Sequence, residues 1–157
     1  MNATEPYNPL MFADLFNRLT ASEPAPLPDA DARLALTALL VRIARADQDY
    51  SDAERARIER VVATRYDLDA AAAAALRGEG EVAEAEAPDT VRFTRAIKDA
   101  VPYEERIGVI EALWEVVLAD GHRDEEESSL LRMIAPLLGV TDRDSNLARR
   151  RVEARRA

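Results

Sequence analysis

The sequence predicts an all-α protein, and three observations carry this prediction. Apolar residues recur at spacings of three and four along most of the chain, which is the period of a helix that buries one face. Alanine and leucine dominate the composition, and only five glycines occur in 157 residues. No stretch alternates between apolar and polar residues as a half-buried strand does. We therefore expect one bundle of about seven helices, which suits the length of a single domain.

The N-terminal region is predicted as a helix followed by a linker. Residues 9–19 place five large apolar side chains on one helical stripe, and residues 22–28 then carry three prolines. We therefore assign residues 1–28 to an N-terminal amphipathic helix and a proline-rich linker. Two alternatives stay open: the helix packs on the body, or its stripe contacts a partner's groove or a membrane surface. The stripe consists of Met11, Phe12, Leu15, Phe16 and Leu19.

The body of the protein begins with a predicted pair of helices. Asp29 or Asp31 is placed to cap the first, which runs to about Arg45 and buries a leucine-rich stripe. A short turn at residues 47–50 follows, and Ser51 opens the second helix. The side chains expected to face inward are Leu36, Leu39, Leu40, Ile43, Ile58, Val61 and Val62.

An alanine-rich helix is predicted next, with Asp69 as its cap. We expect Gly78 and Gly80 to interrupt it, because glycine weakens a helix interior. Residues 79–89 carry five acidic side chains and no basic one, so we interpret them as a solvated acidic segment. A short helix that contains Phe93 follows this segment.

Three helices are predicted in the last third of the chain. Pro102 fits the first position of a long helix, whose apolar side includes Trp114. Asp124 opens the next helix, in which Pro136 predicts a kink or an early end and Gly139 a stop. A final helix then leads into an arginine-rich C-terminus.

Charge is distributed unevenly along the chain. The formal net charge is −9, although residues 149–157 carry five arginines against one glutamate. Thr141 and Asp144 are placed to cap the helix that leads into this stretch. We therefore divide the chain into residues 1–28, a helical domain at 29–148 and an arginine-rich C-terminal tail at 149–157. The acidic body argues against nucleic-acid binding and suits cations or basic partners.

The composition excludes several classes of site. The chain has no cysteine, so disulfides and thiolate metal ligands are absent. No apolar run is long enough to span a membrane, and the N-terminus lacks the features of a secretory signal. We expect a cytoplasmic protein without a membrane span, and we leave peripheral membrane contact and homo-oligomerisation open. No phosphate-binding loop or nucleophile motif occurs, so we expect no enzymatic activity and no organic cofactor.

An internal repeat relates two parts of the body. Residues 33–62 align with residues 106–135 at an offset of 73, and the apolar positions agree throughout. Two helical hairpins in the same register predict a pseudo-twofold core, in which each hairpin covers the apolar face of the other. The aligned pairs include Leu36 with Val109, Leu40 with Leu113, Ile43 with Val116, Asp47 with Asp120, Glu54 with Glu127, and Ile58 with Leu131.

The turn of each hairpin resembles a motif of the TerB-like family, which includes the tellurite-resistance protein TerB and domains attached to DnaJ-type co-chaperones. The shared pattern is Ala-Asp-Gly, then a polar stretch, then a glutamate at the opening of a helix. Residues 119–127 follow this pattern, whereas residues 46–54 have Gln48 in place of the glycine. The resemblance covers residues 30–147. It implies an all-α fold, a context of tellurite or other stress responses, and a divalent-cation role for the acidic residues.

The acidic side chains of the two turns allow two interpretations. In the first they are helix caps: the glutamates complete capping boxes, and the leading aspartates close Asx-turns. In the second they form two oxygen-rich clusters that bind a hard cation, Ca²⁺ or Mg²⁺. An aspartate at the C-terminal end of a helix opposes the helix dipole, and its recurrence in both copies favours this interpretation. The predicted ligands are Asp47, Asp49 and Glu54 in the first turn, and Asp120, Asp124 and Glu127 in the second.

Two functional hypotheses follow. The leading one is a non-enzymatic TerB-like module that binds a divalent cation through both acidic turns. The turns would present the cation, or their own charge, to a partner protein. The alternative is a metal-free protein–protein interaction domain whose acidic turns are only helix caps.

Overall fold

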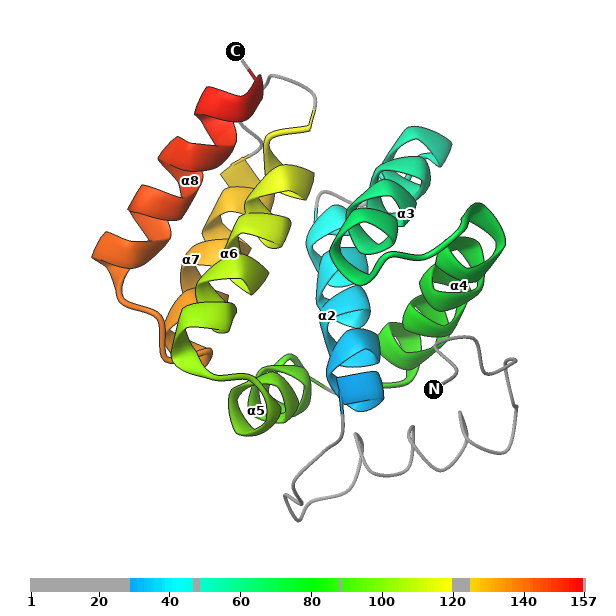
Figure 1. Cartoon of the computed structure of the whole chain (residues 1–157), viewed down its shortest axis with the longest axis horizontal. Helices are drawn as coiled ribbons and strands as arrows, with labels where there is room; N and C mark the ends of the chain where they lie inside the picture. Colours follow the sequence, from blue (N-terminus) through cyan, green and yellow to red (C-terminus); the bar gives the residue numbers. More distant parts are fainter. Residues whose placement is uncertain (1–28, 47–48, 88, 120–124, 157) are drawn as a thin grey trace.

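The computed structural model describes residues 29–46, 49–87, 89–119 and 125–156, and this part of the chain is all-α (Figure 1). The predicted fold class is confirmed, and no strand occurs in these ranges. The N-terminal helix and linker predicted at residues 1–28 lie outside them. The helices are α2 (Asp29–Ala44), α3 (Asp52–Tyr66), α4 (Ala70–Glu86), α5 (Val91–Ala100), α6 (Tyr103–Val117), α7 (Glu125–Leu137) and α8 (Asp142–Arg156).

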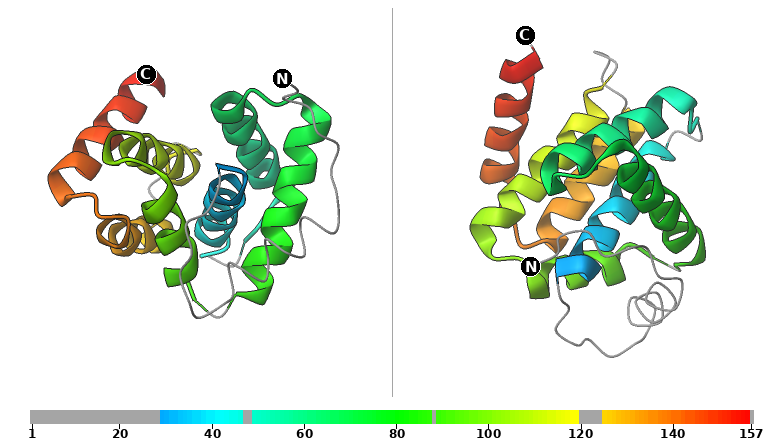
Figure 2. Two further views of the ribbon diagram at one scale, coloured as in Figure 1. Left: turned by 60° about the horizontal axis from the view of Figure 1, so that its bottom comes forward. Right: turned by 45° about the vertical axis from the view of Figure 1, so that its right-hand side comes forward.

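Helix α2 lies at the centre of the molecule and contacts helices α3 to α7 (Figure 2). From Leu34 to Ala44, every side chain except that of Arg42 is buried. The sequence predicts a single inward stripe, whereas this helix is covered all round, as its nearly uniform apolar composition allows. The buried hydroxyl of Thr37 donates to the carbonyl oxygen of Arg33 at 2.7 Å, so its polar group is satisfied within the helix.

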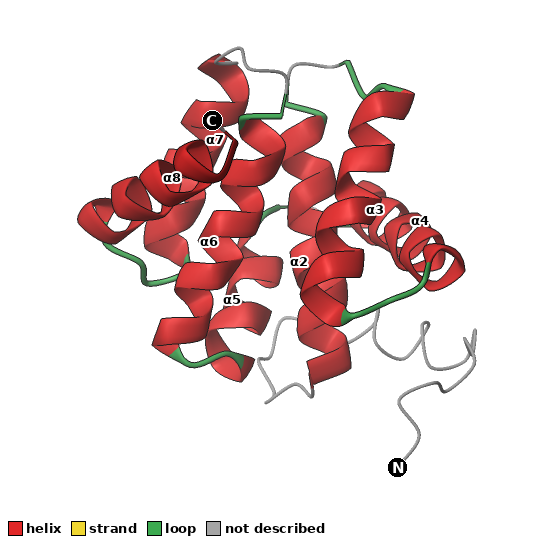
Figure 3. Cartoon of the chain, turned by 45° about the horizontal axis from the view of Figure 1, so that its top comes forward, coloured by secondary structure: helices red, strands yellow, loops and turns green. Residues whose placement is uncertain are grey.

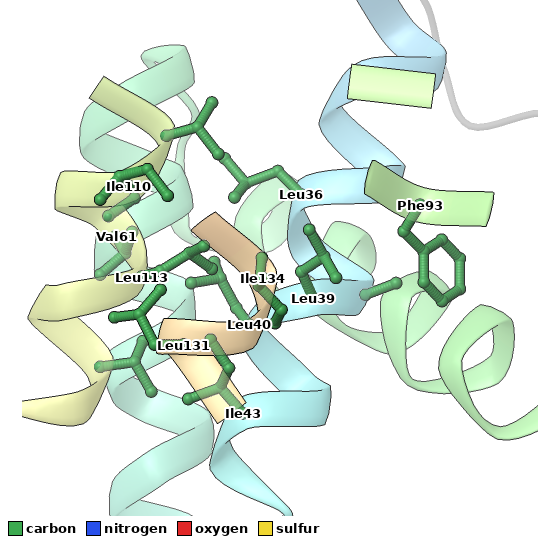
Figure 4. Packing of buried hydrophobic residues seen from close by; sticks show 14 of the residues in the cluster. Leu36, Leu39, Leu40, Ile43, Val61, Phe93, Ile110, Leu113, Leu131 and Ile134 are labelled. Atoms are coloured by element: carbon green, nitrogen blue, oxygen red, sulfur yellow. The ribbon is translucent and has the colours of Figure 1, made fainter. Parts of the chain in front are cut away.

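Two groups of helices lie on either side of α2. Helices α3 and α4 form one group, α6, α7 and α8 form the other, and α5 lies near one end (Figure 1). Helix α8 packs mainly on α6 and is the outermost helix of its group. The core between the groups is aliphatic. Figure 4 shows Leu40 and Ile43 of α2 among Leu113 of α6 and Leu131 and Ile134 of α7.

The helix boundaries keep the offset of the internal repeat. Helix α2 ends at Ala44 and α6 at Val117, while α3 begins at Asp52 and α7 at Glu125, so both boundaries differ by 73 residues. The aligned apolar residues of the two copies are buried in one core. The two connections between helices therefore have equal length, and the pseudo-twofold relation of the hairpins stays a prediction.

The prediction that residues 79–89 form a solvated acidic segment is wrong, because α4 continues through most of this stretch to Glu86. Gly80 lies inside this helix and is buried against Thr37 of α2. A Cβ atom on Gly80 would lie 2.6 Å from Thr37 Cγ2 and 3.2 Å from the Thr37 carbonyl carbon. The glycine therefore permits a close approach of α4 to α2, and it does not mark a helix end.

The predicted ends of α6 and α7 are confirmed with small shifts. Pro102 is the N-cap of α6 rather than its first residue, since the helix begins at Tyr103. Helix α7 ends one residue after Pro136. Gly139 follows with a φ angle of 73°, a left-handed conformation that glycine adopts without steric cost.

The arginine-rich C-terminal region is helical as far as the structure describes it. Helix α8 extends to Arg156, and Val152 within that region is buried against the core. The N–H of Asp144 donates to Thr141 Oγ1 at 3.1 Å, which is the cap that the sequence predicts. This part of the chain is therefore packed on the bundle through α8.

Alanine substitutions at the two glycines of α4 separate helix propensity from packing. Gly78→Ala should raise the free energy of unfolding by about 0.5–1 kcal/mol, because a Cβ there meets nothing within 4 Å and alanine favours a helix. Gly80→Ala should lower it by about 1–3 kcal/mol, because the new methyl group overpacks against Thr37. Urea denaturation followed by circular dichroism measures both changes. Equal stabilisation by the two alanines would contradict the close approach of α4 to α2.

Candidate functional site

The helix ends that flank the two acidic turns lie at the same end of the molecule. Arg57 Nη2 of α3 donates to the carbonyl oxygen of Ala119, just after α6, at 3.2 Å. Figure 3 shows the corresponding ends of α2, α3, α6 and α7 at the top of the bundle. We call this region, formed by the ends of these four helices, the turn end. The sequence alone leaves the relative placement of the two turns open.

The described part of the first turn is a helix cap. Ser51 is the N-cap of α3: the N–H of Glu54 donates to Ser51 Oγ at 3.2 Å, and the Ser51 N–H donates to Glu54 Oε1 at 3.1 Å. The predicted capping box is thus confirmed, and Glu54 holds the start of α3. Asp49 is exposed, and Asp47 lies outside the described residues.

The described part of the second turn contains a buried carboxylate. Glu127, the counterpart of Glu54 in the repeat, lies in the first turn of α7 and is only 5% exposed. Asp120 and Asp124 lie outside the described residues. Among the residues that the structure does describe, no group of three or more acidic or histidine side chains is placed to hold a metal ion. Only three of the six predicted ligands are described, so the two clusters stay predictions.

Two arginines converge on the end of α6. Arg57 of α3 and Arg156 of α8 both donate to the carbonyl oxygen of Ala119, at 3.2 and 2.5 Å. The last carbonyl groups of a helix lack intrahelical partners and carry partial negative charge, so guanidinium groups stabilise them. Because Ala119 directly precedes Asp120, the same arginines weaken the attraction of this region for a cation.

A carboxylate of α4 joins two arginines near the end of α2. Glu84 Oε2 accepts from Arg42 Nε at 3.1 Å, and Glu84 Oε1 accepts from Arg45 Nη1 at 2.7 Å. Arg42 also donates to Thr90 Oγ1 and to the carbonyl oxygen of Ala87. Only 12% of the Glu84 side chain is exposed, so water screens these pairs less than pairs on the open surface. The sequence does not predict this cluster, because residues 79–89 are expected to lie in solvent.

A second carboxylate of α4 joins the first turn to α3 and α4. Glu81 Oε2 accepts from the Tyr50 hydroxyl at 2.6 Å. The same oxygen accepts from Arg77 Nη1 at 2.8 Å and lies 3.4 Å from Arg55 Nε. Arg45 and Arg55 both lie over the Tyr50 ring, at 5.0 and 4.7 Å from its centroid. These contacts fix the chain between the first turn and α3.

The pKa values of this cluster reflect its burial and its ion pairs. Burial and the hydrogen bond to Glu81 raise the pKa of the Tyr50 hydroxyl. Burial alone would raise the pKa of Glu81, but the hydrogen bonds from Tyr50 and Arg77 outweigh it and lower that pKa. Glu81 is therefore held as a carboxylate, and Tyr50 as a neutral phenol that donates to it.

The ion pairs of α4 involve the arginines that lie near the first turn. Arg45 pairs with Glu84, and Arg55 is shared between Asp52 and Glu81. Residues 47–54 contain four acidic side chains and residues 120–127 contain five. Arg45 and Arg55 are thus paired with carboxylates, and by sequence both stretches contain more acidic than basic side chains.

A comparison with family models decides the family. The model described as tellurite resistance protein TerB matches residues 33–150. The chain belongs to the TerB family. The resemblance inferred from the two turns is thereby confirmed, and the match includes both hairpins of the repeat. Searches among curated proteins and among solved structures gave no match.

Within the described ranges, no helix is both long enough and apolar enough to cross a membrane.

Glu79 of α4 gives this TerB-family fold a pH-dependent stability. Its carboxyl group is half-buried, and burial raises its pKa from 4.5 to about 7. The folded state therefore binds this proton more tightly than the unfolded chain does. The contribution of Glu79 to the free energy of unfolding consequently falls as the pH rises from 4.5 to about 7.

Glu79→Gln should raise the melting temperature at about pH 8 and change it little at about pH 5, because glutamine cannot acquire the unfavourable buried charge. Differential scanning calorimetry at both pH values measures the effect. Glu86→Gln, at an exposed position in the same helix, is the control and should change the melting temperature at about pH 8 much less than Glu79→Gln does. The same change in melting temperature at both pH values for Glu79→Gln would contradict the burial argument.

Proposed function

We propose that this TerB-family chain is a non-enzymatic module that binds a divalent cation at the turn end. The observation that carries the proposal is the contact of Arg57 with the carbonyl oxygen of Ala119, which brings the flanks of both turns to one end of the molecule. Carboxylates from both copies of the repeat then contribute to one electronegative region. The proposed ligands are Asp47, Asp49, Glu54, Asp120, Asp124 and Glu127.

The chemistry of these groups suits a hard cation. Carboxylate and backbone carbonyl oxygens are the ligands that Ca²⁺ and Mg²⁺ prefer, and Ca²⁺ takes about six to eight of them. Glu127 adds a carboxylate in the first turn of α7, next to the second acidic turn. The proposal includes no organic cofactor and no catalytic residue.

The arginines at the end of α6 limit the proposed affinity. Arg57 and Arg156 place two positive charges on the residue before Asp120, so a cation bound nearby is repelled by both. We therefore propose modest affinity, with the cation or the charge of the turns presented to a partner protein. The link to tellurite or other stress responses rests on family membership, and the cytoplasmic location stays a prediction from the sequence.

The capping box of Ser51 and Glu54 favours the alternative function. In a metal-free interaction domain, the acidic side chains of the turns hold the starts of α3 and α7 through capping and the helix dipole. The negative turn end would then contact a basic partner protein directly. The two functions differ in one measurable respect, which is their dependence on divalent ions.

Thermal unfolding in EDTA, and then with Ca²⁺, Mg²⁺, Mn²⁺ or Zn²⁺, separates the two functions. Ca²⁺ or Mg²⁺ should raise the melting temperature, since a ligand at about 100 times its Kd adds about 2.7 kcal/mol to stability. Asp49→Asn and Asp120→Asn should each reduce this shift, whereas Asp99→Asn, exposed on α5, should not. A melting temperature that none of the ions changes would contradict the cation site and support the metal-free interaction domain.

Removal of the Arg57 charge tests where the cation binds. Arg57→Gln should tighten Ca²⁺ binding severalfold in isothermal titration calorimetry, because it removes a repelling charge beside the second turn. Arg60→Gln, which removes an exposed arginine further along α3, should have a smaller effect. Equal affinities of the two variants would place the bound cation away from Ala119.

A further inference from the structure

We propose that the outward face of α8 binds an acidic, amphipathic helical segment of a partner protein. This face is formed by Arg143, Leu147, Arg150 and Ala154, and we call it the α8 stripe. The proposal uses none of the turn-end carboxylates and does not depend on a bound cation.

Helix α8 is held to the bundle by one narrow face. Its buried residues are Ser145, Ala148 and Val152, which are three and four positions apart and so lie on one side of the helix. This side faces α6, where Trp114 Nε1 donates to Ser145 Oγ at 3.3 Å. The opposite side of α8 is on the outside of the molecule (Figure 1).

The α8 stripe is basic and has a large apolar residue near its centre. Its four residues follow one another at spacings of four, three and four, and all are exposed. Leu147 is 37% exposed and lies between Arg143 and Arg150. Neither of these arginines has a side-chain ion-pair or hydrogen-bond partner among the residues that the structure describes. Two guanidinium groups and an apolar side chain thus face outward together.

Two further arginines widen the basic surface on the side of α6. Arg151 Nε lies 3.0 Å from Glu111 Oε2, and Arg155 lies 2.9 Å from Glu111 and 3.0 Å from Glu115. The arginine side chains remain 48% and 52% exposed, so these surface pairs contribute little stability in water. Arg151 and Arg155 can therefore share their hydrogen bonds with the carboxylates of a bound segment.

The charge distribution favours a slender acidic partner over a broad anionic surface. Helix α8 carries six arginines and three acidic residues, a net charge of +3, so the rest of the chain carries −12. Charges are screened beyond about 8–10 Å at physiological salt, so a peptide lying along α8 interacts mostly with this helix. A membrane or a nucleic-acid duplex would also approach the acidic body, which repels it.

The spacing of the stripe specifies the partner. From Arg143 to Ala154 the stripe is about 16 Å long, which matches about three turns of a second helix. A helix with two glutamates about seven residues apart and one large apolar residue between them would meet both free arginines and Leu147. Arginine binds a carboxylate through two parallel hydrogen bonds, so this pairing is also directional.

Fluorescence polarisation tests the proposal with two labelled helical peptides added to the full chain. One peptide carries glutamates seven residues apart around a leucine, and the other has glutamines in their place. The chain should bind the glutamate peptide and bind the glutamine peptide at least about tenfold more weakly. The double variant Arg143→Glu with Arg150→Glu should weaken binding of the glutamate peptide about tenfold, and Leu147→Ala should also weaken it.

The control variant combines Arg60→Glu with Arg95→Glu, which reverses two exposed arginines on α3 and α5 and changes the net charge equally. It should retain most of the affinity. If charge reversal unfolds α8, Arg143→Gln with Arg150→Gln gives the same test, and circular dichroism reports the fold.

Three outcomes would overturn the proposal. They are no binding of the glutamate peptide, equal binding of the two peptides, and an equal loss of affinity in the control variant. Co-sedimentation with phosphatidylserine vesicles provides the competing test. If the chain bound only the vesicles, and the α8 variant lost this binding, the partner of the α8 stripe would be a membrane surface and not an acidic helix.

Discussion

The burial of α2 on every side is the constraint on which the rest of the structure depends. A helix without a solvent face must be covered all round, and here α3 to α7 cover it. The cover is tight at one point, where Gly80 of α4 meets Thr37. The chain accepts a glycine inside a helix there, at a cost in helix propensity, because any side chain would separate α4 from α2.

That close approach positions the acidic residues of α4 beside the arginines of α2 and α3. Glu84 joins Arg42 and Arg45, and Glu81 joins Tyr50 to Arg77. These two carboxylates of α4 differ in role from those proposed for the two turns. Glu81 and Glu84 of α4 hold neighbouring helices together, while the proposed function assigns the carboxylates of the two turns to the turn end.

The sequence predicts features that depend on near neighbours or on a regular period. The capping box at Ser51, the stop at Gly139 and the equal length of the two turns are of this kind. The continuation of α4 is missed because a local rule treats Gly80 as a helix breaker, whereas its partner Thr37 is far away in the chain. The placement of the flanking helix ends at one end of the molecule likewise depends on tertiary packing, including the contact of Arg57 with Ala119, which no pattern within either turn contains.

An NMR titration with Ca²⁺ tests most directly the proposal that the two turns act as one cation-binding region. The backbone amides of Ser51–Glu54, of Ala119 and of Glu125–Glu127 can be followed in one series of spectra. If the proposal holds, both groups of amides shift together with a single midpoint, since one bound ion affects both turns. Shifts in only one group, two separate midpoints, or no shift at all would contradict it.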